Sequence, residues 1–375
     1  MSPDVRVASM LAQGNHFVDP ATGAIVPPIH LSATFDRSTG TIDYRRSENP
    51  TNLVVETALA ALDGAAATMT FSSGMGAAVT VLETLRAGQH MVAPIFLYNG
   101  IKRWILRVSK LRGFTVSFAD IREPGALEAA VVPGLTALIW TEVVTNPTCD
   151  VVDIEATARA AHAAGAILVV DATFTPPVTI RPLDLGADLV MQSATKYLNG
   201  HSDVLAGSLS TRDQNERWAE MEYVRMATGA VLHPLDAWLL LRGMRTLAVR
   251  FKEISANALL VAEHFANHPK VDRVLYPGLK THPAHSLAQR ELQGGFGGMM
   301  AIEVRGGLAE AKRVSEAVKL VIRATSLGSV ESLVEHRFPL EGDITPVPEN
   351  LLRLSIGIED PGDLIDDLEQ ALATI

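Results

Sequence analysis

Polar side chains follow three short apolar runs of the sequence, at the point where each run ends. The run 138–140 leads to Glu142 and Asn146, the run 167–170 ends at Asp171, and the run 189–191 opens into Ser193, Thr195 and Lys196. In an open α/β sheet, ligands bind outside the carboxyl ends of the parallel strands. The sequence therefore predicts one polar site that is built from three strand ends.

Lys196 and Asp171 point to a particular chemistry when they are taken together. A lysine amine can form a Schiff base with an aldehyde, a carboxylate can keep a pyridine nitrogen protonated, and hydroxyl groups can donate to a phosphate. Pyridoxal 5'-phosphate carries an aldehyde, a pyridine nitrogen and a phosphate, and its ring serves as an electron sink. Taken singly, Asp171 is better explained as a cap at a strand end, and Lys196 as a solvated loop residue. The combination favours a pyridoxal phosphate site.

A phosphate-binding segment and an aromatic side chain extend this prediction. Ser73, Gly74 and Met75 precede a helical run over 77–85, and backbone amides at a helix N-terminus bind anions. A glycine-containing turn that binds no ligand would have the same sequence pattern. Tyr98 ends another apolar run and can lie flat over a ring, but a core tyrosine would look identical. The residues alone leave both alternatives open.

The elements that must hold these residues alternate along the chain. Between about 54 and 245, helix-like stretches such as 152–164 precede short, nearly continuous apolar runs. Such runs are typical of parallel strands that helices cover on both faces. After a long helix expected over 246–268, strand-like runs such as 299–304 and 353–358 alternate with helices.

This pattern predicts an α/β protein in three parts. We expect an extended N-terminal arm (1–48), a large domain with a mainly parallel sheet that binds the cofactor (49–245), and a smaller α+β C-terminal domain (246–375). The last helix has a clear start, with Asp360 as its cap and Pro361 at its first position.

Composition and charge argue against several classes of function. Among 375 residues, 32 lysines and arginines stand against 42 acidic residues, and a net charge of -10 leaves no basic excess for nucleic acid. The longest uncharged run, 64–82, is too polar to span a membrane, and residues 1–12 lack the apolar core of a signal peptide. Cys149 is the single cysteine, so no intrachain disulfide forms, and a thiol nucleophile is an open alternative. We expect a cytoplasmic protein.

Several ordered motifs resemble one enzyme family. The segment 193–197 (Ser-Ala-Thr-Lys-Tyr), followed by 200–203 (Gly-His-Ser-Asp), is similar to the cofactor-lysine signature of the Cys/Met metabolism family of pyridoxal phosphate enzymes, the transsulfuration group. Matching blocks occur in the same order at 44–46, 49–51, 72–75, 170–171, 234–239, 276–279 and 326–333. The resemblance covers residues 28 to 375 and implies fold type I, the aspartate-aminotransferase-like fold.

The resemblance also implies a role for each matching residue on the cofactor side. Lys196 would hold the cofactor, Asp171 would meet its ring nitrogen, and Tyr98 would stack on the ring and assist proton transfer. The phosphate would be bound by Ser73, Gly74, Met75, Ser193 and Thr195. Tyr44 and Arg46 match a pair that reaches the phosphate of a neighbouring subunit. This implies a homodimer with shared active sites, and family members are usually tetramers.

On the substrate side, the resemblance assigns the substrate carboxylate to Arg353. Asn146, which also lies beside the cofactor, and the backbone near Ser326 would assist it, while Arg103 and Glu331 match positions near the distal part of the substrate. The sequence departs from the family pattern at four places, which are Ala172, Asn99, the segment 142–147, which lacks a proline usual in the family, and the segment 335–339 (Glu-His-Arg-Phe-Pro). These departures concern the substrate more than the cofactor.

The motif at 326–333 resembles that of the cystathionine γ-synthase and γ-lyase branch of the family, and this resemblance implies γ-elimination or γ-replacement. We expect a cystathionine-like amino acid or an O-acylhomoserine as the substrate, and Lys196 as the group that moves protons once substrate has displaced it. The alternatives are a β-lyase acting on cystathionine or cystine, and a specialised enzyme for an unusual γ-substituted amino acid.

Two further classes stay open from the sequence. A metal-dependent hydrolase would use the histidines His264, His268, His282 and His285, but no glutamate accompanies them at the required spacing, so no metal site is expected. A silent relative that acts as a scaffold would not need the intact set of Lys196, Asp171 and Arg353.

Overall fold

The computed structural model describes residues 5–38, 40 and 42–375. A seven-stranded sheet forms the centre of the larger part, with the order β1-β7-β6-β5-β4-β2-β3. Its strands are β1 (Ala67–Phe71), β2 (His90–Pro94), β3 (Thr115–Ala119), β4 (Thr136–Glu142), β5 (Ile167–Asp171), β6 (Leu189–Gln192) and β7 (Gly207–Thr211). The strands β2 to β6 pair in parallel, and β7 is antiparallel to both of its neighbours.

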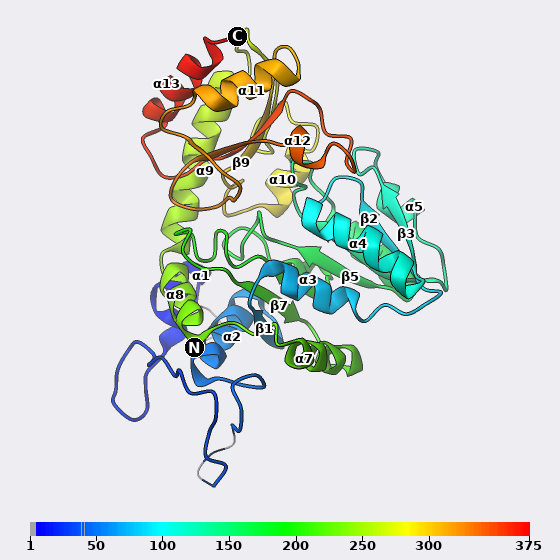
Figure 1. Cartoon of the computed structure of the whole chain (residues 1–375), viewed down its shortest axis with the longest axis vertical. Helices are drawn as coiled ribbons and strands as arrows, with labels where there is room; N and C mark the ends of the chain where they lie inside the picture. Colours follow the sequence, from blue (N-terminus) through cyan, green and yellow to red (C-terminus); the bar gives the residue numbers. More distant parts are fainter. Residues whose placement is uncertain (1–4, 39, 41) are drawn as a thin grey trace.

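Both faces of this sheet are covered by helices, as the continuous apolar runs predict (Figure 1). Successive residues of one strand belong to different cores, because side chains alternate across a sheet. Leu138 and Val169 pack in one apolar cluster, whereas Ile139 and Leu168 pack in another. The helices of this part are α2 (Pro50–Asp63), α3 (Gly74–Leu82), α4 (Asn99–Arg112), α5 (Ala126–Ala129), α6 (Ile154–Ala163), η2 (Pro182–Leu185), α7 (Glu216–Thr228) and α8 (Pro234–Met244).

The long helix α9 (Leu247–Phe265) leads from the larger part to a second, five-stranded sheet (Figure 1). The order of this sheet is β10-β11-β12-β9-β8. Its elements are β8 (Val271–Leu275), α10 (His285–Glu291), β9 (Met299–Val304), α11 (Leu308–Ala317), β10 (Ile322–Arg323), β11 (Leu333–His336), α12 (Phe338–Glu341), β12 (Leu351–Ser355) and α13 (Pro361–Leu372). The predicted start of α13 is confirmed, since the Asp360 side chain accepts from the backbone N–H groups of Gly362 and Asp363.

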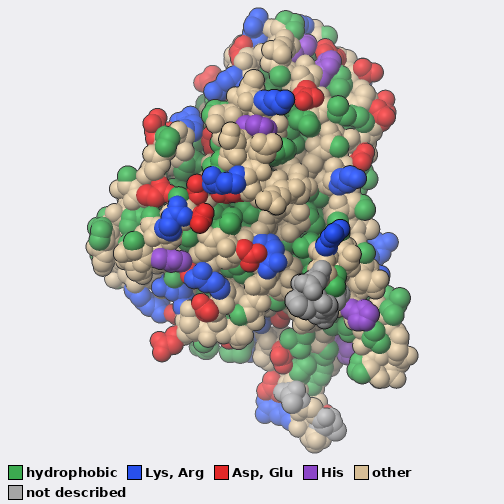
Figure 2. All heavy atoms as spheres, turned by 180° about the vertical axis from the view of Figure 1, so that it is seen from behind, with side chains coloured by type: hydrophobic (Ala, Val, Ile, Leu, Met, Phe, Trp, Pro, Cys, Tyr) green, Lys and Arg blue, Asp and Glu red, His purple; other side chains and the backbone are tan. Residues whose placement is uncertain are grey.

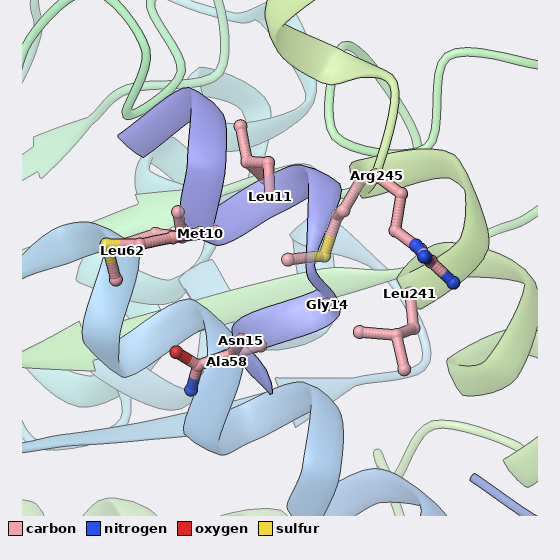
Figure 3. A pocket seen from close by; sticks show the side chains of 9 residues that line it. Met10, Leu11, Gly14, Asn15, Ala58, Leu62, Leu241 and Arg245 are labelled. Carbon is pink, nitrogen blue, oxygen red and sulfur yellow. The ribbon is translucent and has the colours of Figure 1, made fainter. Parts of the chain in front are cut away.

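The N-terminal segment differs in part from the extended arm that the sequence predicts. Residues 7–12 form a short helix, α1, and Gly14–His16 form a 3-10 turn, η1. Met10 and Leu11 pack with α2 and α8 around a small apolar pocket of about 230 Å³ (Figure 3). Apolar residues at helical spacing bury one face of α1, a periodicity too short to stand out in the sequence. From 17 to 48, the described residues form no helix, only an isolated bridge between Thr34 and Tyr44.

The surface carries mixed charges. On the face seen in Figure 2, lysine and arginine side chains lie interspersed with aspartates and glutamates. Within 5–38, 40 and 42–375, every helix is too short or too polar to cross a membrane. The boundaries of the three expected parts stay a prediction.

Candidate active site

A cavity of about 850 Å³ opens where the carboxyl ends of the large sheet meet loops and strands of the C-terminal part. Most of the predicted site residues line this cavity. The fold thus brings together residues as far apart in the sequence as Ser73 and Arg353. The predicted residues in the cavity wall are Ser73, Gly74, Met75, Tyr98, Asn146, Asp171, Ser193, Thr195, Lys196, Ser326 and Arg353. Four predicted residues, Tyr44, Arg46, Arg103 and Glu331, are not among those that line this cavity.

Lys196 lies just beyond the end of β6, and its side chain extends into the cavity wall. Its Nζ donates to Ser326 Oγ at 2.7 Å. Burial and the neighbouring Arg353 guanidinium together lower the pKa of the Lys196 ammonium to about 8, against the opposite effect of Glu335. A substantial share of this amine is therefore neutral near physiological pH, as a nucleophile or proton acceptor requires.

Two carboxylates lie side by side at the ends of β4 and β5, since Glu142 pairs in register with Asp171. Burial raises the pKa of Asp171 to about 6, and burial together with the Asp171 charge raises the pKa of Glu142. Asp171 Oδ1 accepts from the Thr173 backbone N–H at 2.9 Å. A cation placed beside Asp171 would relieve the cost of keeping this buried carboxylate charged.

Glu142 has a positioning role that the sequence analysis did not assign. Its Oε1 accepts from the backbone N–H of Tyr98 at 2.7 Å, and its Oε2 accepts from the backbone N–H of Asn146 at 2.8 Å. One buried carboxylate thus fixes two segments that line the cavity. A carboxylate directly at a strand end was the only signal for it in the sequence.

The N-terminus of α3 faces the same cavity. Ser73 is its N-cap, and the Ser73 Oγ accepts from the Gly76 N–H at 3.0 Å. Gly74 is required by close packing, because a Cβ there would lie 2.8 Å from the Cβ of Ser193. Further along the same wall, the Thr195 hydroxyl donates to the Ala206 carbonyl at 3.1 Å. The Ser73 hydroxyl and the free amides of α3 form a ready-made site for an anion, whereas the Thr195 hydroxyl is engaged with the backbone of Ala206.

Tyr98 lines the cavity and the residue is 41% exposed, so it is not a core tyrosine. It immediately precedes α4, and its ring lies against Gly100, where an added Cβ would be 2.7 Å from Tyr98 Cε1. An exposed aromatic face in the wall of a polar cavity is available for stacking.

Arg353 lies on β12 and is nearly fully buried, with 4% of its side chain exposed. Its Nη1 donates to Asn146 Oδ1 at 3.1 Å, and its Nη2 donates to the Ser326 carbonyl at 3.1 Å and to Glu335 Oε2 at 2.7 Å. Glu335 faces Arg353 directly across the β11–β12 pair. Although burial acts against its charged form, the two flanking guanidinium groups of Arg353 and Arg337 lower the pKa of Glu335.

The segment that departs from the family pattern forms an ion network in this wall. Arg337 lines the cavity, donates through Nε to Glu341 Oε1 at 2.8 Å, and also pairs with Glu335. Neither Arg337 nor Glu335 was assigned a role from the sequence, because the cross-strand register that brings them to Arg353 is not visible there. Ala172, where the sequence also departs from the family pattern, is buried and directly follows β5.

The four predicted residues outside the cavity have other partners. Arg103 donates to Asp343 Oδ1 at 2.6 Å and to the Leu340 carbonyl at 3.2 Å, and Glu331 accepts from the Ser202 hydroxyl. Tyr44 and Arg46 lie exposed on the N-terminal segment, with the guanidinium 5.5 Å from the tyrosine ring centroid.

The histidines considered for a metal site are engaged elsewhere. His264 and His268 contact Glu369 at 2.6 and 3.2 Å, and His285 Nδ1 lies 2.9 Å from the Pro277 carbonyl. His282 is largely buried near Cys149, whose own burial raises the pKa of its thiol far above the usual range. In the described part of the chain, no group of three or more His, Cys, Asp or Glu residues is arranged to hold a metal ion.

The donor set fits pyridoxal 5'-phosphate. An amine with a pKa of about 8, a buried carboxylate, an exposed aromatic ring and a helix N-terminus surround one cavity, and they match an aldehyde, a ring nitrogen, a flat ring and a phosphate respectively. The mainly parallel sheet with this site at its carboxyl edge, and the smaller C-terminal part, define the class of pyridoxal-phosphate-dependent enzymes of fold type I.

Comparisons with known proteins identify the family. The profile of the family "Cys/Met metabolism PLP-dependent enzyme" matches residues 8–373, so the chain belongs to this family and is a pyridoxal-phosphate-dependent transsulfuration enzyme. A cystathionine gamma-synthase of Mycobacterium tuberculosis is 43% identical over 94% of this chain and 93% of its own length. A cystathionine gamma-lyase of Dictyostelium discoideum is 39% identical over 98% of this chain and 97% of its own. The crystal structure of cystathionine gamma synthase from Xanthomonas oryzae pv. oryzae in complex with cystathionine is 38% identical, with a TM-score of 0.93 over 98% of both chains.

Proposed function

We propose that this protein catalyses γ-elimination or γ-replacement on an amino acid with a leaving group at Cγ, such as cystathionine or an O-acylhomoserine. One observation carries the proposal, namely that the Lys196 amine, the Asp171 carboxylate and the Arg353 guanidinium all line one cavity. The relatives named as cystathionine gamma-synthase and gamma-lyase support this substrate class.

The residues in the sheet-side wall would hold the cofactor, with Lys196 as its covalent anchor. The bound cofactor supplies an electron sink for negative charge that develops on the substrate carbons. Asp171 would pair with the ring nitrogen, and the charge of the protonated ring would offset the burial of the carboxylate. Ser73 and the amides of α3 would bind the phosphate.

Lys196 would also move protons, because its amine is free once substrate has taken its place on the cofactor. A base with a pKa of about 8 accepts a proton from Cα and can return one after the leaving group departs. The hydrogen bond to Ser326 Oγ keeps Nζ on the side of the cavity where Arg353 lies. Tyr98 is the second candidate for proton transfer, since its ring is exposed at the cavity.

Arg353 would bind the α-carboxylate of the substrate. Asn146 and the Ser326 carbonyl orient the guanidinium through hydrogen bonds of 3.1 Å each, so the fork is already in place before a substrate arrives. A planar guanidinium can accept a carboxylate in two parallel hydrogen bonds, which lysine cannot do.

We also infer a homodimer in which the exposed Tyr44 and Arg46 reach the phosphate site of the second subunit, and a tetramer made of two such dimers. Both side chains lie outside the cavity of their own chain, in agreement with a role in another subunit. Their residues belong to the expected arm (1–48), which precedes the proposed cofactor domain (49–245) and C-terminal domain (246–375). With one cysteine and no disulfide, we place the protein in the cytoplasm.

Borohydride reduction tests the cofactor assignment directly. The purified protein should be yellow, lose its visible band on reduction, and gain the mass of the reduced cofactor on the peptide that contains Lys196. Lys196→Ala should lack the band, whereas Lys312→Ala, at an exposed position on α11, should retain it. A colourless wild-type protein that does not take up pyridoxal phosphate would refute the proposal.

Product analysis separates the possible reactions. With cystathionine, 2-oxobutyrate would indicate γ-elimination, whereas pyruvate would indicate the β-lyase reaction. With cysteine and an O-acylhomoserine, formation of cystathionine would indicate γ-replacement. No turnover across a panel of amino acids would leave a protein that binds the cofactor without this activity, and the proposed function would be wrong.

A further inference from the structure

Arg337 is a charged side chain in the cavity wall that has no role in the proposed reaction as described above. It precedes α12, and 4% of its side chain is exposed. Nε donates to Glu341 Oε1 at 2.8 Å, and Nη1 pairs with Glu335. Two buried carboxylates thus hold the guanidinium in one orientation.

The guanidinium of Arg337 still has donors to offer. Arginine has five N–H donors, and the contacts with Glu335 and Glu341 use Nε and Nη1. Within the described part of the chain, no acceptor is bonded to Nη2, and this atom is not one of the buried polar atoms that lack a partner, so it keeps accessible surface on a residue that lines the cavity. An accessible guanidinium N–H in a cavity wall can donate to a carboxylate oxygen of a bound molecule in a charge-assisted hydrogen bond.

The wall that carries Arg337 is braced from outside the cavity. Arg103 Nη2 and Asn99 Nδ2, both on α4, donate to the Leu340 carbonyl at 3.2 and 3.1 Å. Arg103 additionally pairs with Asp343. Arg103, which the family resemblance assigns to the distal part of the substrate, therefore supports α12 here, and Arg337, unlike Arg103, lines the cavity.

We propose that Arg337 determines substrate specificity by binding a carboxylate at the far end of the γ-substituent. Arg337 and Arg353 both bond Glu335 Oε2, so their guanidinium groups are neighbours in the wall. One molecule can then place its α-carboxylate on Arg353 and a second, distal carboxylate on Arg337. The favoured substrate is an amino acid with two carboxylates, such as an O-acylhomoserine whose acyl group ends in one. This inference rests on the proposed function and specifies its substrate.

A matched pair of substrates tests the role of Arg337. O-succinylhomoserine has the distal carboxylate, and O-acetylhomoserine lacks it. The wild-type enzyme should prefer the succinyl ester in kcat/KM, and Arg337→Met should lower this preference about 10- to 100-fold, mainly through KM, because a hydrogen bond to a charged partner is lost. The preference is a ratio within one preparation, so it does not depend on how much of a variant has folded.

Matched variants distinguish specificity from a structural role. Arg337→Met combined with Glu341→Gln keeps the net charge of the network and should show the same loss of preference. Arg290→Met is the control variant. Arg290 forms an exposed ion pair with Asp153 away from the cavity, so this variant should leave the preference unchanged. Equal losses for both esters in the Arg337 variants would mean that Arg337 only supports the wall, and would overturn the inference. A changed preference in Arg103→Met but not in Arg337→Met would overturn it as well.

Binding of unreactive amino acids separates this inference from the proposed reaction. L-2-aminoadipate and L-norleucine have equal chain lengths, and only the first has a distal carboxylate. The wild-type holoenzyme, titrated by the change in its visible spectrum, should bind 2-aminoadipate about 10-fold or more tightly than norleucine, and Arg337→Met should remove the difference. If this difference is found without turnover of either ester, the inference stands and the proposed reaction fails. Equal binding of the two amino acids by the wild-type enzyme would refute the inference.

Discussion

Two walls of the same cavity are built in different ways. The sheet wall consists of residues at the strand ends of the large sheet and the start of α3, including Ser73, Asp171 and Lys196. Two of its polar groups are held by nearby backbone, since Asp171 accepts from Thr173 N–H and Ser73 accepts from Gly76 N–H. The C-terminal wall includes Ser326, Arg337 and Arg353. Its two arginines are held by ion pairs with Glu335 and Glu341, which do not line the cavity themselves.

This difference shows how the molecule combines a fixed cofactor site with an adjustable substrate site. Backbone hydrogen bonds at strand ends are part of the fold, so the sheet wall cannot change without changing the sheet. The C-terminal wall depends on side chains of a short segment next to α12, which can be exchanged in a set that keeps its charges paired. Both arginines and both glutamates of that wall are buried, so each charge there needs its partner.

Substitution of Asp171 by Asn should have the largest effect and should separate the walls most clearly. The amide cannot carry the charge that keeps the cofactor ring protonated, so kcat should fall at least about 100-fold. KM for the amino acid should change far less, because the C-terminal wall is intact. The visible spectrum of the bound cofactor and steady-state kinetics provide the measurements. A rise in KM with unchanged kcat would contradict the assignment of Asp171 to the cofactor.

Arg353→Lys should give the reverse pattern. Lysine keeps the charge but loses the fork that Asn146 and Ser326 orient, so KM should rise about 10- to 100-fold while cofactor absorbance stays normal. Arg305→Lys, at an exposed pair with Asp272, is the matched control and should behave as wild type. If Arg353→Lys lost the cofactor instead, the two walls would not be functionally separate.

The pH dependence of cofactor attachment tests the sheet wall without any substrate. Burial lowers the pKa of Lys196 to about 8, and the neutral amine is the form that reacts with an aldehyde. The rate at which apoprotein gains its visible band should therefore rise about tenfold per pH unit below 8 and level off above it. Because Arg353 contributes to the lowered pKa, the Arg353→Leu variant should move the midpoint upward. A midpoint near the ordinary lysine value of 10.5 in the wild type would contradict this account.

The sequence predicts the residues of the sheet wall better than those of the C-terminal wall. Lys196, Asp171 and Asn146 were found because apolar runs mark strands, and parallel strands present their carboxyl ends at one edge. The elements α6 and α9 fell within a few residues of their predicted bounds. Glu335 and Arg337 were missed as site residues, because only the antiparallel register of β11 and β12 places Glu335 opposite Arg353. The short helix α1 was missed because two turns give too few residues for a periodic signal.

Ser73→Ala should have the smallest effect and tests whether the start of α3 is held by its cap alone. The Ser73 hydroxyl accepts from Gly76 N–H, and loss of such a cap costs about 1 kcal/mol of unfolding free energy. Since the amides of α3 would still face the cofactor phosphate, cofactor affinity should weaken only several-fold, and KM should be unchanged. Urea unfolding of the apoprotein and titration with pyridoxal phosphate measure the two effects. Loss of cofactor binding by more than about 100-fold would mean that the hydroxyl binds the phosphate itself with the strength of a charge-assisted bond, and that α3 contributes little of the anion site.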